Sequence, residues 1–263
     1  MVPEPVHAAR ELPGAPLPTF VVADPREAAI GVASEIATLV DTARARSEDL
    51  ILGLATGHTP LELYEELVRR TRTGLDLACV RTFNLDEYVG LAHDHPSSFR
   101  SFMRRHLFDP AGVPQAHTHI PDGTLADADL ARHCAEYERA IAEAGGIDLQ
   151  LLGLGINGHI AFNEPGTPFD SRTRVETLTD QTRIANAGDF ASGEEVPERA
   201  LTMGIATILE SRRVRVLAFG PHKAPVVERL LRGPVETAFP ASCLLGHPDA
   251  TLWIDEAAAP SAC

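Results

Sequence analysis

A histidine and a glutamate lie close together in the glycine-rich stretch 153–165, GLGINGHIAFNEP. Its first six residues match the G-x-G-x-x-G pattern of dinucleotide-binding loops. Such a loop leads at once into a helix, however, and the run Asn-Glu-Pro at 163–165 would interrupt that helix after about two turns. We therefore interpret the stretch as a glycine-walled cleft that holds His159 close to a substrate. Histidine is suited to moving protons near neutral pH, and Glu164 is near enough to orient the imidazole.

Two adjacent carboxylates, Asp86 and Glu87, follow the apolar run 79–84. A carboxylate at the end of a buried strand can act as a general base, provided that the reacting proton lies within about 3 Å of it. Neighbouring residues of an extended chain face opposite ways, so we expect only one of the two to enter a cleft. The alternative is a solvent-exposed acidic loop without a catalytic role.

A third motif is the run 56–60, Thr-Gly-His-Thr-Pro, between an expected strand and an expected helix. Glycine lets the backbone approach a ligand closely, and the hydroxyls of Thr56 and Thr59 can donate hydrogen bonds. The N-terminus of the helix would add free N–H groups and a partial positive charge, which is typical of a phosphate site. The same residues also fit an ordinary turn in which Thr59 caps the helix and Pro60 opens it, so both interpretations stay open.

Apolar runs that alternate with amphipathic stretches must position these motifs, and this alternation is typical of an α/β fold. The expected architecture is a three-layer α/β/α, Rossmann-like domain whose mainly parallel sheet is flanked by helices. The expected strands are 19–23, 50–55, 79–84, 149–155, 214–220 and 250–255, and the clearest helices are 25–45 and 60–70. Ligands of open α/β sheets bind beyond the carboxyl ends of the strands. The loops after Ala55, Phe83 and Gly153 are therefore the expected site.

The composition limits the class of protein. The chain has 263 residues and a formal net charge of -14 that is spread along its length, which argues against a nucleic-acid partner. No apolar run reaches the roughly 18 residues of a membrane span and none resembles a signal peptide, so we expect a cytoplasmic protein without a membrane partner. The four cysteines show no short spacing and are expected to be free thiols. Residues 1–15 are expected to form a flexible proline-rich arm, and residues 16–263 a single catalytic domain.

Four segments resemble those of one known family and occur in the family's order. They are TFNLDEYVGL at 82–91, GLGINGHIAFNEP at 153–165, SRTRVETLT at 171–179 and GPHKA at 220–224. Together they are similar to the glucosamine-6-phosphate deaminase/6-phosphogluconolactonase family over about residues 28–255. The lactonases typically carry Asp-Glu-Arg where this chain has Asp-Glu-Tyr at 86–88, and they lack the Phe-Asn-Glu-Pro ending. The resemblance is therefore to the deaminases.

The resemblance implies a cofactor-free, metal-free enzyme that converts D-glucosamine 6-phosphate and water to D-fructose 6-phosphate and ammonium in amino-sugar catabolism. It implies that Asp86 takes the C2 proton of the open-chain sugar, after which the enolamine is protonated and loses ammonium. It implies that His159 opens the pyranose ring with help from Glu164, and that Asn157 positions the imidazole. The residues implied to hold the 6-phosphate are Thr56, Gly57, His58, Thr59 and Lys223.

Four positions depart from the family pattern: Asn157 stands where some members carry an aspartate, His58 replaces a small residue of the phosphate loop, and the other two are Gly188 and Glu176. Gly188 stands where an arginine usually helps to bind phosphate, a loss of about 1–3 kcal/mol. The replacements that the sequence offers are Arg172, Arg174 and Arg183. A shifted preference, for galactosamine 6-phosphate or 6-phosphogluconolactone, is the alternative. Glu176 replaces a lysine of the family's site for N-acetylglucosamine 6-phosphate between subunits, so we predict weak or absent allosteric activation.

The sequence argues against two further classes of function. The histidine pairs 93/95 and 117/119 lack a third convergent ligand, so no metal site is expected. A non-catalytic sugar-phosphate sensor of the kind found in transcription regulators would need a DNA-binding helix-turn-helix, for which residues 1–15 leave no room. The expected partner is a small sugar phosphate, and the resemblance allows a monomer or a homo-oligomer.

Overall fold

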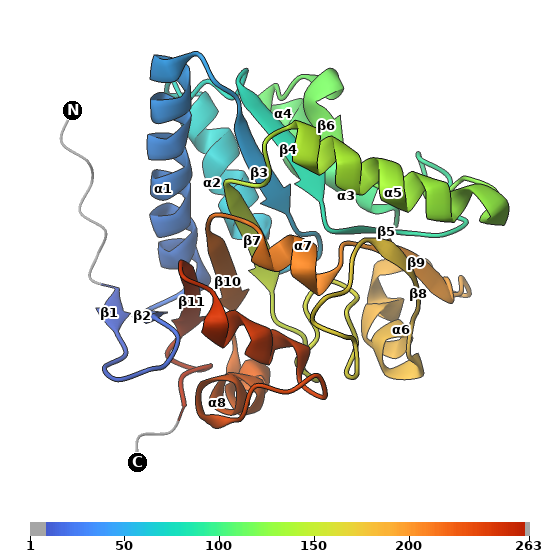
Figure 1. Ribbon diagram of the computed structural model, residues 1–263. Helices are drawn as coiled ribbons and strands as arrows, with labels where there is room; N and C mark the ends of the chain where they lie inside the picture. The colour runs from blue at the N-terminus through green and yellow to red at the C-terminus, as the bar shows by residue number, and fades with distance from the viewer. Residues whose placement is uncertain (1–8, 261–263) are drawn as a thin grey trace.

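The structure is a computed structural model that describes residues 9–260. An eight-stranded sheet has the order β1-β2-β11-β10-β7-β3-β4-β6, and every neighbouring pair is parallel except β1 and β2 (Figure 1). Its strands are β1 (Arg10–Glu11), β2 (Thr19–Val22), β3 (Leu50–Leu54), β4 (Val80–Asn84), β6 (Thr118–His119), β7 (Leu149–Gly153), β10 (Val214–Ala218) and β11 (Ala250–Asp255). The mainly parallel sheet and all six predicted strands are confirmed.

Side chains of a strand point alternately to the two faces of its sheet. Both faces of this sheet are apolar, and helices cover both. Ile51 belongs to one apolar cluster, and its neighbours Leu50 and Leu52 belong to the other. One face carries α1 (Pro25–Arg46), α2 (Leu61–Thr71), α3 (Phe99–Met103), a π-helical turn (Arg104–Phe108) and α4 (Asp109–Ala111). The other carries α5 (Asp127–Glu143), α7 (Ile205–Leu209) and α8 (Ala224–Arg232) (Figure 1). The predicted three layers are confirmed.

The starts of the first two helices differ. At α1 the Asp24 carboxylate accepts a hydrogen bond from the Glu27 N–H at 3.0 Å, which is the usual side-chain cap. The predicted cap of α2 is wrong, because α2 begins at Leu61, Pro60 occupies the cap position, and no side chain caps it. The hydroxyl of Thr59 is therefore not used to start the helix.

A second, three-stranded antiparallel sheet was not predicted from the sequence. Its order is β5-β9-β8, with β5 (Asp86–Tyr88), β9 (Arg199–Thr202) and β8 (Arg174–Thr177), and it lies beside α6 (Asp180–Asn186) (Figure 1). The chain passes from the large sheet to the small one at Leu85, whose N–H donates to Leu54 at 3.0 Å and whose carbonyl accepts from Met203 at 2.7 Å. Asp86 then pairs with Thr202. Leu85 thus ties the two sheets together directly before Asp86, the first residue of β5.

Part of the expected N-terminal arm is a strand. Arg10–Glu11 pairs antiparallel with β2, and the Leu12 N–H donates to Thr19 at 2.8 Å. The expectation of an irregular arm is therefore wrong for residues 10–11, since the backbone bonds of an edge strand require no particular side chains. Residues 1–8 of that arm lie outside the described residues.

Cys79, Cys134 and Cys243 are free thiols, as predicted, and Cys263 lies outside the described residues. Within residues 9–260, no helix combines the length and apolar character needed to cross a membrane.

Candidate active site

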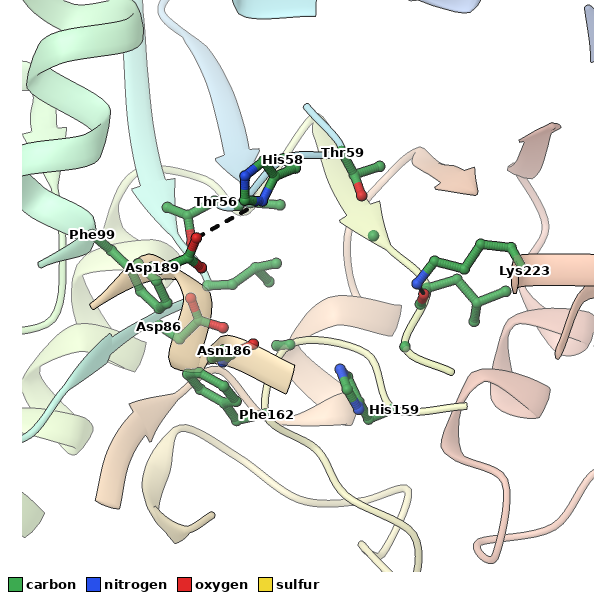
Figure 2. A pocket seen from close by; sticks show the side chains of 17 residues that line it. Thr56, His58, Thr59, Asp86, Phe99, His159, Phe162, Asn186, Asp189 and Lys223 are labelled. Atoms are coloured by element: carbon green, nitrogen blue, oxygen red, sulfur yellow. Dashed lines mark hydrogen bonds and ion pairs between the residues drawn. The ribbon is translucent and has the colours of Figure 1, made fainter. Parts of the chain in front are cut away.

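A cavity of about 210 Å³ opens at the carboxyl ends of β10, β7, β3 and β4. The chain runs from β3 outward to β4 and β6, and from β7 outward to β10 and β11 in the opposite direction, so the cavity lies at the point where the sheet changes direction. The three predicted loops all reach it, and a fourth loop, after β10, adds Lys223. Figure 2 shows Asp86 and His159 on opposite sides of the opening, with His58 and Thr59 along a third side.

Asp86 enters the cavity and Glu87 does not, as the alternation of side chains predicts. The Asp86 side chain is buried, with the rings of Phe99 and Phe162 nearby (Figure 2), and no hydrogen bond acts on its carboxylate within residues 9–260. Burial, and then the charge of Glu87, raises the pKa of Asp86 to about 8. The ionised form of Asp86, whose fraction grows as the pH approaches 8, is a stronger base than an exposed carboxylate, and without a partner in the cavity it is suited to accepting a proton from a ligand.

Glu87 holds a helix in place instead. Its carboxylate accepts hydrogen bonds from the backbone N–H groups of Tyr88, Phe99 and Arg100 at 2.9–3.0 Å. Burial raises the pKa of Glu87, whereas these three bonds lower it. Because two of the bonds go to the first turn of α3, Glu87 fixes Phe99 at the cavity wall. Phe99 was not among the residues predicted for the site.

His159 is oriented through Asn157, and Glu164 does not touch the ring. The Asn157 Oδ1 lies 2.7 Å from the His159 Nδ1, and the Asn157 Nδ2 donates to the Glu164 Oε2 at 2.9 Å. Since an amide oxygen can only accept, Nδ1 carries the hydrogen and Nε2 is left as the free base. Burial lowers the pKa of His159, the Glu164 carboxylate opposes this, and the Lys223 ammonium lowers it further. The neutral ring is therefore favoured near pH 7.

The small sheet and α6 hold the loop that carries Glu164. The hydroxyls of Thr179 and Thr182 both donate to the Glu164 carboxylate, which is buried. Next to it, the Asn163 side-chain amide donates to the carbonyl of Met203 at 2.9 Å, just past the end of β9. The charge that supports the histidine is thus positioned by residues far away in the sequence.

The loop between β3 and α2 presents unpaired donors to the cavity. Thr56, Gly57, His58 and Thr59 all line it, and Gly57 adopts a left-handed φ of +85°. The backbone N–H groups of residues 57–59 donate to no backbone group within the described chain. Free N–H groups at the start of a helix form an anion site, so the geometry favours the phosphate interpretation over a simple cap.

Lys223 brings a positive charge to the same wall. Its Nζ donates to the Leu154 carbonyl at 2.6 Å, and burial lowers its pKa. It is the sole lysine or arginine that lines the cavity within residues 9–260. Arg172 and Arg174 form ion pairs with glutamates, and Arg183 donates to a backbone carbonyl, so none of the three replaces the cation missing at Gly188.

Two cavity residues, Asn186 and Asp189, were missed by the sequence analysis. They come from α6 and from the 3-10 turn Ala187–Asp189 that follows it. The Asn186 side chain donates to the Tyr88 hydroxyl at 2.9 Å, which anchors the segment to β5. One signal in the sequence could have found these two residues. Gly188 lies between them and stands where the resemblance implies a phosphate-binding arginine, so its neighbours were candidates for the site.

Comparisons with known proteins agree with this geometry. The family model of glucosamine-6-phosphate isomerases/6-phosphogluconolactonase matches residues 23–253. The chain belongs to this family of α/β proteins. A glucosamine-6-phosphate deaminase of Rhodopirellula baltica is 57% identical over 210 residues, 80% of this chain and 83% of the relative. One of Bacillus pumilus is 48% identical over 225 residues, 85% of this chain and 92% of the relative.

Solved structures show the same likeness. A structure described as a monomeric glucosamine-6-phosphate deaminase has a TM-score of 0.87 and 43% identity, covering 91% of this chain and 98% of its own. A 6-phosphogluconolactonase from Trypanosoma brucei has a TM-score of 0.72 and 23% identity, covering 91% and 96%. This second likeness shows the shared fold alone.

Proposed function

We propose that this chain is a glucosamine-6-phosphate deaminase, which converts D-glucosamine 6-phosphate and water to D-fructose 6-phosphate and ammonium. The observation that carries the proposal is the buried, unpaired Asp86 carboxylate facing the same cavity as the free Nε2 of His159. A base and a neutral imidazole are the two proton-transfer groups that the reaction needs. The relatives that share about half of their residues with this chain carry the same name.

Binding and ring opening come first in the proposed mechanism. The N–H groups of loop 56–59 and Lys223 hold the 6-phosphate and so place the sugar against Asp86 and His159. The Nε2 of His159 takes the proton of the anomeric hydroxyl O1 and returns a proton to the ring oxygen O5, and the C1–O5 bond breaks to give the aldehyde. Asn157 fixes the tautomer that this transfer requires, and Glu164 stabilises the imidazolium while it exists.

Isomerisation and loss of the amine follow. Asp86 removes the C2 proton, the electrons form a C1–C2 double bond, and the aldehyde oxygen takes up a proton to give an enolamine. Protonation at C1 leaves an imine at C2, to which water adds, and ammonium departs to leave the ketone. Water thus replaces the amine, so we assign the enzyme to the hydrolases. Proton transfers and one water account for every step.

Location and assembly are proposed from the substrate and from one relative. The proposed location is the cytoplasm, because a charged sugar phosphate does not cross an apolar membrane unaided. A monomer is the proposed oligomeric state, in place of a homo-oligomer, by similarity to the deaminase whose structure is described as monomeric.

The test of the proposed function is product formation by the purified chain. Glucosamine 6-phosphate is expected to yield ammonium and fructose 6-phosphate in equal amounts without added metal. Galactosamine 6-phosphate and 6-phosphogluconolactone, assayed in parallel, are expected to react at least tenfold more slowly by the general scale of transition-state discrimination. No release from glucosamine 6-phosphate by folded protein would contradict the proposal, and faster turnover of either alternative would reassign the substrate.

Gly155 gives a prediction about the position of the imidazole. A methyl group at Gly155 would lie 2.4 Å from ring atoms of His159, so the ring must move. Because a displacement of about 1 Å can cost about 100-fold, Gly155→Ala is expected to lower kcat/KM by about that factor. Gly188→Ala is the matched control, since its methyl group would meet nothing within 4 Å. Ammonium release measures both variants, and full activity of Gly155→Ala would show that the ring position is not critical.

A further inference from the structure

His58 and Asp189 face each other in the wall of the cavity and come from two different elements. His58 belongs to the loop between β3 and α2, and Asp189 ends the 3-10 turn after α6. The His58 Nδ1 lies 3.9 Å from the Asp189 Oδ1, and a dashed line marks this pair in Figure 2. Both residues line the cavity. The pair therefore connects the anion-binding loop to the α6 segment.

The charges of the cavity wall make this pair unusual for a site that accepts phosphate. Within the described residues, the ionisable groups that line the wall are Lys223, His58, His159, Asp86 and Asp189. A phosphate that enters beside His58 meets the Asp189 carboxylate, and two anions at such close range repel each other. An imidazole donates a hydrogen bond in either tautomer and is a cation once protonated, so it suits either anion.

We propose that Asp189 and the phosphate of the substrate compete for His58, so that binding breaks the pair and His58 becomes a phosphate ligand. The identity of the ligand as a sugar phosphate rests on the proposed function; the competition itself rests on the observed pair. His58 then adds a second side-chain donor to the phosphate beside Lys223, and Asp189 sets the affinity by holding that donor when the site is free.

The surroundings of Asp189 allow the exchange. Its backbone carbonyl accepts a hydrogen bond from the Ser97 hydroxyl at 2.8 Å, and Asn186 is tied to Tyr88. Its side chain is 45% exposed and pairs within the described residues with His58 alone. The carboxylate can therefore turn toward solvent while the anchors keep the backbone of the segment in place.

The test is binding of glucitol 6-phosphate, an open-chain sugar phosphate that lacks both the carbonyl and the amine and cannot react. Isothermal titration of Asp189→Asn is expected to give about two- to fivefold tighter binding, the range of an exposed ion pair. His58→Asn is expected to weaken binding by a similar factor. In the double variant, the tightening caused by Asp189→Asn is expected to vanish, because the group under competition is gone.

Asp180→Asn is the matched control, and three results would contradict the proposal. Asp180→Asn makes the same charge change in α6 at a side chain that is 94% exposed and outside the cavity wall, and it is expected to leave the affinity unchanged. Weaker binding by Asp189→Asn would show a direct contact with the sugar, and equal tightening with and without His58 would show simple repulsion; either result overturns the proposal. So does a wild type that fails to bind glucitol 6-phosphate. If the wild type binds glucitol 6-phosphate and the variants behave as expected, but the wild type releases no ammonium from glucosamine 6-phosphate, the deaminase assignment fails and the proposed competition stands.

Discussion

Asp86→Asn is expected to lower the kcat of ammonium release by about 10²- to 10⁴-fold, the range lost when a positioned general base is removed. Asparagine has almost the same shape but cannot take the C2 proton, and the neighbouring Glu87 cannot replace Asp86, because Glu87 is turned away and tied to three N–H groups. The affinity for glucitol 6-phosphate is expected to change little. Asp94→Asn, the same substitution in an exposed residue away from the cavity, is the control and is expected to keep full activity. An active Asp86→Asn variant would exclude Asp86 as the base.

The same substitution is expected to stabilise the protein at high pH. The pKa of Asp86 is about 8 in the folded state against 3.8 ordinarily, so between these values the folded chain holds a proton that the unfolded chain has lost. The free energy of unfolding contributed by this group therefore falls as pH rises from about 4 to about 8 and stays low above that. Asparagine carries no charge and avoids this cost.

Thermal unfolding across pH measures the effect. The Tm of Asp86→Asn is expected to exceed that of the wild type at pH 8.5, by about 2–4 °C for each kcal/mol regained, and to approach it at pH 4.5. The difference in Tm between the variant and the wild type isolates the contribution of Asp86, because the titration of all other groups affects both proteins equally. A variant that is less stable than the wild type at pH 8.5 would contradict the raised pKa of Asp86.

The second large effect is expected at His159. His159→Gln is expected to lower kcat by about 10²- to 10³-fold, because glutamine is polar and of similar reach but cannot carry the proton from O1 to O5. The KM is expected to stay within a few fold, and so is the affinity for glucitol 6-phosphate, which has no ring to open. His93→Gln, at an exposed histidine outside the cavity, is the control. An increase in KM without a decrease in kcat would assign His159 to binding rather than to ring opening.

Several parts of the site could be predicted because they depend on local sequence. Strands buried in a parallel sheet must be apolar over their whole length, and turn residues bound them, so β3, β4 and β7 were found. Parallel strands end at one edge, and this brings Thr56, Asp86 and His159 to the same cavity. The alternation of side chains also predicted that only one of Asp86 and Glu87 would face it.

Other parts depend on contacts between distant segments, which local patterns do not encode. The small sheet pairs Asp86 with Thr202 through strands of three and four residues, too short to show a periodic pattern. The role of Asn157 as the bridge from Glu164 to His159 follows from where the loop folds back, not from its spacing.

The sequence by itself therefore determined the layers of the fold and the edge of the sheet where Asp86 and His159 reach the cavity. These features follow from burial and from the geometry of single strands and loops. Only the tertiary structure decided that Asp189 faces His58, because that contact depends on α6 packing against β5 through Asn186 and Tyr88. Such packing joins segments about a hundred residues apart, and no local sequence pattern indicates which distant segments will pack together.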